Sequence, residues 1–379
     1  MNSPLAVLLI GGKGAVATTV LAAWCARRAG LDVPCPLPSE ADPDLAALPL
    51  RPFEAMTFGG WDPDPRPCSE AARAHGCLPD GLLREVASGL DAVPFFEPAL
   101  GGTGLEHQAA RLREAIRRFR DDCGARRAIV VDLASTERFC EPGPVHEELG
   151  AFERALAVDD PAVSPGMAYA WAAIREDVPF VSFTPSLTCE IPALRGLAEA
   201  RGVPVCGKDG KTGQTLYKSV LAPMLRQRNL RVRGWYSTNI LGNNDGAVLD
   251  KSEHRATKIA SKRSGLARIL GYEDFEHQVH IHYYPPRGDF KEAWDVVDCS
   301  GWLGIPLQIR VNWQASDSAL AAPLVVDLCR WADWAAERGE GGILPWLAAY
   351  FKSPLGSTEH DFARQCALLR AHVLGDGRA

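Results

Sequence analysis

The stretch PLAVLLIGGKGAVATTVLAAWCARRAG, residues 4–30, decides the fold class. Its first seven residues form an apolar run that is typical of a buried strand. Gly11, Gly12 and Gly14 follow as a tight turn, and the apolar residues after them recur at helical spacing until Gly30. A strand, a glycine turn and a helix in this order let the backbone approach a pyrophosphate at the helix N-terminus. The stretch therefore predicts the first unit of a dinucleotide-binding fold.

The glycine turn departs from the GxGxxG pattern at one position, because Ala17 stands where the third glycine is expected. That position needs only a small side chain, so alanine is tolerable there. A flavodoxin-like turn that holds no cofactor stays open as the alternative. The residues predicted to contact the cofactor here are Gly11, Gly12, Lys13, Gly14, Ala15 and Val16.

An acid that binds the ribose hydroxyls is expected about 20 residues after such glycines. Asp32 lies in that region but is followed by a proline-rich segment. Asp62 ends the apolar and aromatic run TFGGWD, which is a probable strand. We choose Asp62 for the ribose, while the role of a simple turn acid stays open for it.

Strand-like and helix-like runs keep alternating downstream. An amphipathic helix is expected within residues 104–122, and buried strands are expected within 125–135, 180–185 and 204–208, with a helix at 192–202. This alternation predicts an α/β protein with a doubly wound parallel sheet.

The pattern changes near residue 230. RVRGWYSTNILG, QVHIHYYPP and PLQIRVNWQ alternate bulky and polar residues with period two, as strands of a sheet with unlike faces do. A basic helix is expected at residues 251–271, and another helix is expected to start near Lys291. The tail, residues 319–356, is predicted to be helical and to pack back on the first unit.

Composition excludes several classes of protein. The 379 residues carry a formal net charge of −6, so no global basic field attracts nucleic acid or an anionic membrane. No stretch reaches the roughly 18 apolar residues of a membrane helix, and the N-terminal run lacks the features of a signal peptide. Eleven cysteines occur without any CxxC pair, which is typical of a reduced compartment and offers no metal motif. We therefore expect a cytoplasmic protein without a metal site.

The segment after residue 207 contains the unusual chemistry. Lys258 and Lys262 are four residues apart, so their ammonium groups would repel on one helix face unless an anion offsets the repulsion. STNILGNNDG is unusually rich in amides, and TGQT, residues 212–215, supplies hydroxyls and an amide at a predicted helix start. With Lys291 these groups suit a phosphorylated, polyhydroxylated substrate, although each has a plain surface interpretation.

The order of motifs is similar to that of the inositol-3-phosphate synthase (myo-inositol-1-phosphate synthase) family. It runs GGKGA, FGGWD, LASTERF, KDGKTGQTLYKS, STNILGNNDG, RATKIASK, GDFKEA, DSALAAPLVVDL and FKSP, and covers nearly the whole chain. The pair of GQTxxKS and NxLGNNDG is the most specific part.

The resemblance implies an NAD-binding Rossmann domain at residues 1–207, an α+β catalytic and oligomerisation domain at 208–315, and C-terminal helices at 316–379. It implies a homotetramer in which tightly bound, recycled NAD serves a sugar-phosphate cyclase. Carbon 5 of glucose 6-phosphate is oxidised, carbon 6 loses a proton and attacks the carbon 1 aldehyde, and the ring ketone is reduced again. A requirement for a divalent cation or ammonium stays open.

The resemblance also implies site residues. The catalytic set is Lys258, Lys262, Lys291, Lys352 and Asp317. The substrate-phosphate set is Thr212, Gly213, Gln214, Thr215, Asn239 and Asn243. The cofactor set adds Asp62, Ser135, Thr136, Asp209 and Asp245 to the glycine loop, with Asp209 facing the nicotinamide.

One turn departs from the family pattern, because SFTPSLTCEIPA carries Thr184 and Leu187 where the family has amides. The side chains at these two positions would contact the substrate and determine which sugar is accepted. A cyclase that converts fructose 6-phosphate to a five-membered cyclitol phosphate, as in carbocyclic nucleoside pathways, is therefore an alternative. A plain dehydrogenase or a non-catalytic NAD-binding relative is a different class, against which the retained lysines argue.

Overall fold

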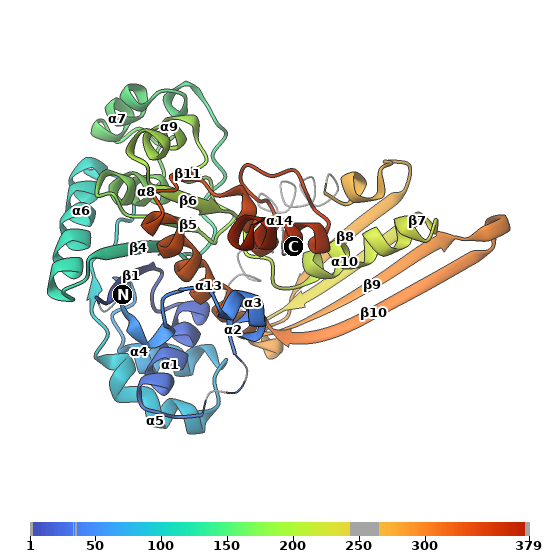
Figure 1. Cartoon of the computed structure of the whole chain (residues 1–379), viewed down its shortest axis with the longest axis horizontal. Helices are drawn as coiled ribbons and strands as arrows, with labels where there is room; N and C mark the ends of the chain where they lie inside the picture. Colours follow the sequence, from blue (N-terminus) through green and yellow to red (C-terminus); the bar gives the residue numbers. More distant parts are fainter. Residues whose placement is uncertain (1–2, 33, 35, 243–264, 376–379) are drawn as a thin grey trace.

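A seven-stranded parallel sheet forms the larger part of the molecule (Figure 1). The computed structural model describes residues 3–32, 34, 36–242 and 265–375. The strand order β11-β6-β5-β4-β1-β2-β3 changes direction between β1 and β4, which creates a topological switch point. The strands are β1 Leu5–Ile10, β2 Met56–Trp61, β3 Phe95–Phe96, β4 Arg127–Asp132, β5 Phe180–Ser182, β6 Pro204–Gly207 and β11 Gly342–Ile343.

Helices cover both faces of this sheet, which explains why β1 is a continuous apolar run. Leu5, Val7 and Leu9 pack into one core, while the alternate residues of β1 pack into the other. The first core lies under α1 Ala15–Arg28, α4 Cys68–His75, α5 Asp80–Asp91 and α13 Asp317–Glu337. The second lies under α6 Leu105–Asp122, α7 Leu149–Ala157, α8 Pro165–Arg175 and α9 Pro192–Arg201. The short helices α2 Pro38–Ala41 and α3 Pro43–Ala46 join the first group.

A second, four-stranded sheet extends away from the first, with β9 and β10 projecting furthest (Figure 1). Its order is β10-β9-β7-β8, with β7 and β8 parallel and the other pairs antiparallel. The strands are β7 Arg231–Leu241, β8 Glu276–Tyr283, β9 Phe290–Ser300 and β10 Pro306–Ser316. Helix α10 Gln214–Gln227 packs on one face through Ala222 and Leu225. On the other face, Tyr236 and Trp294 are exposed.

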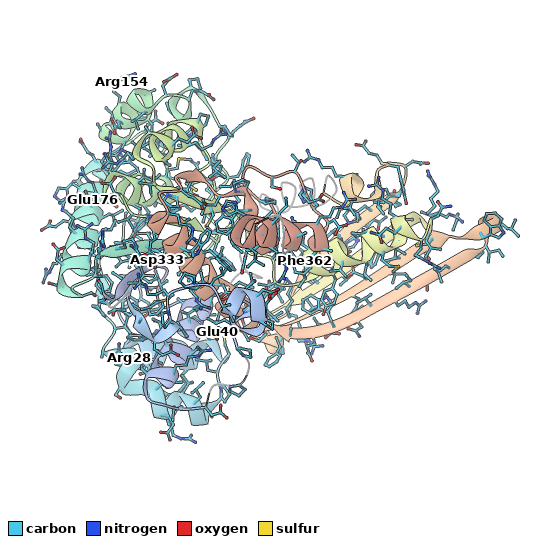
Figure 2. The ribbon with its side chains drawn as sticks, viewed as in Figure 1. Arg28, Glu40, Arg154, Glu176, Asp333 and Phe362 are labelled. Carbon is cyan, nitrogen blue, oxygen red and sulfur yellow. The ribbon has the colours of Figure 1, made fainter. Side chains whose placement is uncertain are left out.

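The tail returns to the first sheet. Helix α13 packs on α1 and β4, and β11 pairs with β6. Asp333 of α13 lies inside the molecule (Figure 2), where it accepts hydrogen bonds from Arg51 at 3.1 Å and Arg127 at 2.5 Å. Helix α14, Phe362–Leu374, follows and packs on the short 3-10 helix Pro345–Tyr350. Short 3-10 turns occur at Phe53–Ala55, Pro144–His146, Pro285–Arg287, Trp302–Gly304 and Pro345–Tyr350.

The predicted fold class is confirmed, but two local predictions are wrong. Residues after Asp289 form strand β9 and not a helix, because alternate side chains from Ala293 onward are buried and both edges of the strand pair with neighbours. The tail is helical in α13, but residues 342–343 form strand β11, since Gly342 and Ile343 pair with the edge strand β6. The predicted boundaries at residues 207 and 315 stay predictions. Among the described helices, none is long and apolar enough to cross a membrane.

Candidate functional site

A cavity of about 270 Å³ lies between the two sheets, at the carboxyl ends of β1 and β4. This is the place where open α/β sheets bind ligands. Two walls line it. The glycine wall consists of Gly14, Ala15, Val16, Leu133, Ala134, Ser135 and Thr136. The lysine wall consists of Asp209, Thr212, Gly213, Gln214, Thr215, Asn239, Lys291, Asp317 and Lys352. Of the predicted site residues that the structure describes, the cavity thus gathers all except Gly11, Gly12, Lys13 and Asp62.

The glycine loop is held open by backbone contacts. The N–H groups of Gly11 and Gly12 donate to Trp61 O at 2.9 and 3.1 Å, and Gly14 N donates to Gly11 O. Gly11 has φ +70°, and a Cβ there would lie 3.0 Å from Ala134 Cα, so only glycine fits. Gly14 caps α1 without a side-chain contact, which leaves the first N–H groups of α1 facing the cavity. This backbone cradle fits the pyrophosphate of a dinucleotide.

Lys13 and Asp62 support this loop from outside the cavity lining. The Asp62 carboxylate accepts from Lys13 N and from Asp64 N, both at 2.8 Å. Lys13 Nζ donates to the carbonyls of Asp64 at 2.5 Å and Arg66 at 2.7 Å. His75 Nε2 lies 2.8 Å from Lys13 O. Asp62 is at the end of β2, where a ribose acid is expected, and in this structure it also holds the turn.

Ser135 and Thr136 follow β4 directly. Their segment is fixed by Leu133 N, which donates to Ile10 O at 3.0 Å, and by Ala134 N, which donates to Asp132 Oδ1. Asp132 is fully buried behind the glycine wall, and burial raises its pKa to about 8. The carboxyl group is therefore neutral at neutral pH, which is how it tolerates that position.

The loop at residues 208–215 is fixed by the C-terminal segment. Lys208 and Ser353 exchange backbone hydrogen bonds, and Lys211 N donates to Tyr350 O at 2.8 Å. Asp209 has φ +61°, a conformation that Asp tolerates better than most residues. Lys352 N donates to Asp209 O at 2.7 Å, and Lys352 Nζ lies 2.8 Å from Asp209 Oδ1. This pairing brings Lys352 to the cavity although it lies 143 positions from Asp209.

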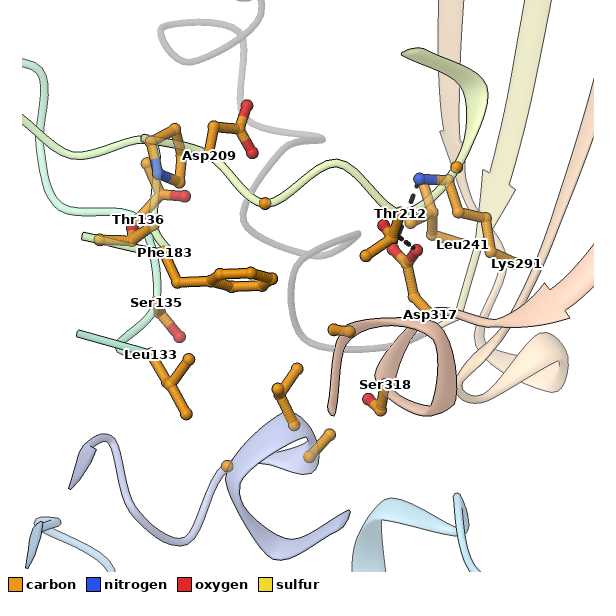
Figure 3. A pocket seen from close by; sticks show the side chains of 18 of the residues that line it. Leu133, Ser135, Thr136, Phe183, Asp209, Thr212, Leu241, Lys291, Asp317 and Ser318 are labelled. Atoms are coloured by element: carbon orange, nitrogen blue, oxygen red, sulfur yellow. Dashed lines mark hydrogen bonds and ion pairs between the residues drawn. The ribbon is translucent and has the colours of Figure 1, made fainter. Parts of the chain in front are cut away.

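A second acid and lysine pair closes the lysine wall (Figure 3). Lys291 Nζ lies 3.4 Å from Asp317 Oδ2, and Thr212 Oγ1 donates to Asp317 Oδ1 at 2.9 Å. Burial would raise the pKa of Asp317, but the ammonium groups of Lys291 and Lys352 and the Thr212 hydroxyl hold it below its ordinary value. The carboxylate is therefore ionised across the neutral range.

Asp289 joins the two segments that carry this pair. It is buried, and it accepts from the hydroxyls of Ser316 and Ser318, which flank Asp317 at the start of α13. Asp289 itself lies two residues before Lys291. One carboxylate therefore fixes how Asp317 faces Lys291.

Helix α10 begins at Gln214, and Gly213 precedes it without any side-chain cap. A Cβ on Gly213 would lie 2.8 Å from the Trp313 ring and 3.8 Å from Lys291 Nζ, so the loop is tightly packed beside that lysine. The Gln214 side chain is buried and bonded to Asp295 at 3.0 Å and to Asn239 at 2.8 Å. The Gln214 side chain is therefore not available to a ligand. Its backbone N–H lies at the N-terminus of α10 and can donate to an anion.

Four predicted site residues, Lys258, Lys262, Asn243 and Asp245, lie outside the described residues. Asn239 lies within β7, which pairs with β8 and β9 on its two sides. Of the two departures in the SFTPSL turn, Thr184 lines the cavity, while Leu187 packs into the core under α8 and α9.

Sequence reasoning missed several lining residues. Phe183 and Pro185 follow β5, and the rule that strand carboxyl ends line the site was a signal that could have found them. His75 and Ser318 also line the cavity, from the end of α4 and the start of α13. No local pattern marks these two, because they reach the cavity only through packing.

A second cavity of about 320 Å³ lies behind the lysine wall and shares Asp209, Thr215 and Lys352 with the first. Lys211 and Lys218 line it, and burial lowers the pKa of each to about 8. Lys211 is bonded to Gln365 and lies 5.4 Å from the ring centroid of Phe362, which is labelled in Figure 2. Within the described ranges, no three His, Cys, Asp or Glu side chains are grouped to hold a metal ion.

Comparison with known proteins gives concordant matches. The family model described as Myo-inositol-1-phosphate synthase matches residues 43–373. Inositol-3-phosphate synthase 1 of Bacteroides thetaiotaomicron is 40% identical over 388 residues, which cover 94% of this chain and 90% of that protein. The Mus musculus protein of the same name is 30% identical over 83% of this chain, and the match spans 62% of its length. The crystal structure of inositol-3-phosphate synthase from Caenorhabditis elegans shares the fold, with a TM-score of 0.88 at 22% identity, covering 99% of this chain and 86% of that one.

Proposed function

We propose, on the premise that the chain belongs to the myo-inositol-1-phosphate synthase family, that it converts glucose 6-phosphate to an inositol phosphate with no net redox change. It is an isomerase of the inositol-3-phosphate synthase type. The observation that carries the proposal is the 40% identity over 94% of the chain. The pairing of a backbone cradle with a wall of lysines and acids in one cavity supports it.

The glycine wall would hold NAD, because its small residues and exposed helix N–H groups fit a pyrophosphate. The predicted contacts are the loop from Gly11 to Val16, with Ser135 and Thr136 beside the nicotinamide end and Asp62 toward the ribose. When bound, NAD would supply the hydride acceptor for carbon 5 of the sugar, and its reduced form the hydride donor for the same carbon. Asp209 on the opposite wall would face the nicotinamide side.

The start of α10 would hold the phosphate. Thr215 offers a hydroxyl, and the N–H groups of the first turn offer uncompensated donors. The Thr212 hydroxyl donates to Asp317, so it would have to leave that carboxylate in order to donate to the phosphate. Since the Gln214 side chain is engaged internally, the backbone N–H of that residue is the group we assign to the phosphate.

Lys291 and Lys352 would stabilise the negative charge that develops when the carbon 6 proton leaves and when the new ring closes. Each ammonium is oriented by one acid, Lys291 by Asp317 and Lys352 by Asp209. A preorganised donor of this kind contributes roughly 3 kcal/mol to the transition state. By the resemblance, Lys262 joins Lys291 in polarising carbonyl oxygens, and Lys258 moves the proton on the carbon 5 oxygen.

The test incubates the purified protein with NAD⁺ and either glucose 6-phosphate or fructose 6-phosphate, with products identified by ¹³C NMR. We expect inositol phosphate from glucose 6-phosphate and no steady growth of NADH absorbance. Parallel reactions with EDTA, Mg²⁺ or ammonium decide the ion requirement. NADH formed in proportion to product would contradict a cyclase, and a cyclic product from fructose 6-phosphate alone would move the assignment to that sugar.

We also propose that the chain is a homotetramer in which the outer face of the second sheet is buried. This face exposes Tyr236 and Trp294, and the hairpin between β9 and β10 exposes Trp302 and Leu303. Exposed apolar groups of this extent are typical of interfaces. Light scattering after gel filtration should give four times the chain mass, and Trp294→Asp should lower it. A wild-type monomer would contradict this part of the proposal.

A further inference from the structure

We propose that Asp295 is a positioning residue that sets the direction of two amide side chains, so that Asn239 presents its oxygen to a hydroxyl group of the sugar phosphate. The inference rests on the proposed function, because the hydroxyl belongs to its substrate. Asp295 has no predicted role from the sequence. It lies on β9, four residues after Lys291, and faces α10.

The Asp295 carboxylate is the fixed end of the network. Asp295 is 2% exposed, and three donors converge on it. Trp235 Nε1 and Ser237 Oγ donate to Oδ1 at 2.7 and 2.6 Å, and Gln214 Nε2 donates to Oδ2 at 3.0 Å. An indole N–H can only donate, and an ionised carboxylate can only accept. The same carboxylate stabilises the buried ammonium of Lys218 electrostatically.

The direction of the Gln214 amide follows from its hydrogen bond to the Asp295 carboxylate. Since Asp295 only accepts, Gln214 must turn its NH₂ group toward Asp295 and its oxygen away. The oxygen accepts from Asn239 Nδ2 at 2.8 Å. The direction of each amide is therefore set by hydrogen-bond chemistry.

The direction of Asn239 follows in turn. Its nitrogen is directed to Gln214, so its oxygen is the amide atom left for a ligand in the cavity that Asn239 lines. An amide oxygen repels a phosphate oxygen and accepts from a hydroxyl group. This assigns Asn239 to a sugar hydroxyl, in place of the phosphate contact that the resemblance implies for it.

The test exchanges the acid and the amide. In Asp295→Asn, the NH₂ of the new amide would face the NH₂ of Gln214, so the Gln214 and Asn239 amides must turn over or lose their bonds. In the double variant Asp295→Asn with Gln214→Glu, the new Asn donates to the new Glu, which accepts from Asn239. The double variant has the same atoms in nearly the same places, the same net charge and the original direction at Asn239.

The kinetic readout is the ratio of kcat/KM for glucose 6-phosphate to kcat/KM for analogues that each lack one hydroxyl. In the wild type we expect this ratio to be large for one hydroxyl. Asp295→Asn should lower that ratio at least tenfold, the equivalent of one lost hydrogen bond in a buried site, with most of the change in KM. The double variant should recover the ratio, because it restores the original direction of the Asn239 amide. Any effect of the displaced charge on the phosphate changes both kcat/KM values alike and cancels in the ratio.

Two further measurements separate the possible failures. Inhibition by inorganic phosphate should change less than threefold in Asp295→Asn, and the melting temperature should fall in that variant and recover in the double variant. Asp333→Asn is the matched control, because Asp333 is equally buried but contacts Arg51 and Arg127 away from the cavity. It should lower the melting temperature and leave the hydroxyl ratio unchanged.

Several results would overturn the inference. It is wrong if Asp295→Asn keeps the wild-type ratio, if the double variant fails to recover the ratio, or if phosphate inhibition weakens as much as the ratio falls. If Asp295→Asn does not fold, the folded double variant compared with wild type still decides whether the direction is set by the exchanged pair. If the wild type makes no inositol phosphate, the proposed function is contradicted but the amide directions are not. The melting temperatures of Asp295→Asn and the double variant test those directions without any turnover.

Discussion

The glycine wall and the lysine wall face each other across one cavity but present polarity in opposite ways. On the glycine wall the polar groups are backbone N–H groups and two hydroxyls. The nearby charges of Lys13 and Asp62 are used to bond the glycine loop to the turn after β2. On the lysine wall the polar groups are charged side chains, and Lys291 and Lys352 each contact an acid. The first wall suits a cofactor that stays bound, and the second suits a substrate whose charge changes during reaction.

The difference also concerns how each wall is assembled. The glycine loop is built from neighbouring residues and one contact with the turn after β2. The acid on each lysine comes from a distant segment, 26 positions away for Lys291 and 143 for Lys352. The arrangement of charges on the lysine wall therefore depends on how the tail docks on the loop at 208–215. The structure of the glycine loop does not depend on that docking.

The largest expected effect comes from removing a charge from the lysine wall. Lys291→Ala should lower kcat/KM for glucose 6-phosphate about 1,000-fold, because it deletes a transition-state donor and leaves Asp317 with less compensation. NAD affinity should stay within threefold, since the glycine wall is untouched. Product formation by NMR and NAD titration by calorimetry measure the two quantities.

Arg118→Ala serves as the control for Lys291→Ala, because Arg118 is an exposed cation on α6, away from both the cavity and the second sheet. It should change neither quantity. Turnover like that of the wild type in Lys291→Ala would remove this lysine from the mechanism.

The next prediction concerns the charge of Lys218, which is buried behind the lysine wall. Burial lowers the pKa of Lys218 from 10.5 to about 8. The unfolded chain therefore binds more protons than the folded chain between these values, so this residue destabilises the fold by roughly 3 kcal/mol below pH 8 and by little above pH 10.5. Lys218→Met should remove this penalty, apart from a constant change due to the lost contact with His277.

Urea unfolding of the wild type and Lys218→Met at pH 7, 8, 9 and 10 measures this. The wild type should gain stability relative to the variant as pH rises, and the buried cysteines, which titrate alike in both proteins, cancel in the difference. A difference independent of pH would show that the pKa of Lys218 in the fold equals its unfolded value, so that the cost of burying the charge is fully compensated.

The two walls also explain which parts of the site could be predicted from sequence. The glycine loop, α10 and its Thr212–Thr215 start follow from local patterns, since the residues of each are adjacent in the chain. The pairs of Lys291 with Asp317 and Lys352 with Asp209 depend on tertiary docking. The sequence itself singled out Lys291, but only the family resemblance pointed to Asp317, Lys352 and Asp209, and to Ser135 and Thr136 on the glycine wall. Asp295, Asp289 and His75 were not found at all, because a buried polar residue has no periodic signature.

The mistaken helix at Lys291 has a similar cause. GDFKEAW contains good helix formers, but Ala293 and Asp295 are buried and Lys291 lines the cavity on the same face of β9, so period-two burial overrides local propensity. The fold class could be predicted from the sequence because it depends on the repeated alternation of strands and helices over the whole chain. Only the part of the site that is formed by neighbouring residues could be predicted in this way.

A smaller effect is expected on the glycine wall. Gly11→Ala forces a left-handed alanine against Ala134, which should weaken NAD binding about 30-fold. Gly30→Ala is the matched control, because Gly30 has φ +71° but a Cβ there has open space. It should destabilise the fold by about 1 kcal/mol and leave NAD affinity unchanged. Equal losses of NAD affinity in both variants would mean that strain, and not contact with Ala134, limits the loop.

The smallest effect separates two roles of Asp62. Asp62→Ala should weaken NAD binding about tenfold, because Lys13 N and Asp64 N lose their acceptor and the ribose loses a carboxylate. Asp64→Ala is the control, since Asp64 lies in the same turn but pairs with Arg66. NADP distinguishes the roles, because its 2′-phosphate is repelled by a carboxylate at the ribose. If Asp62 contacts the ribose, Asp62→Ala weakens NAD but not NADP. If it only holds the turn, both affinities fall by the same factor, and the glycine wall then binds its cofactor without any side-chain charge.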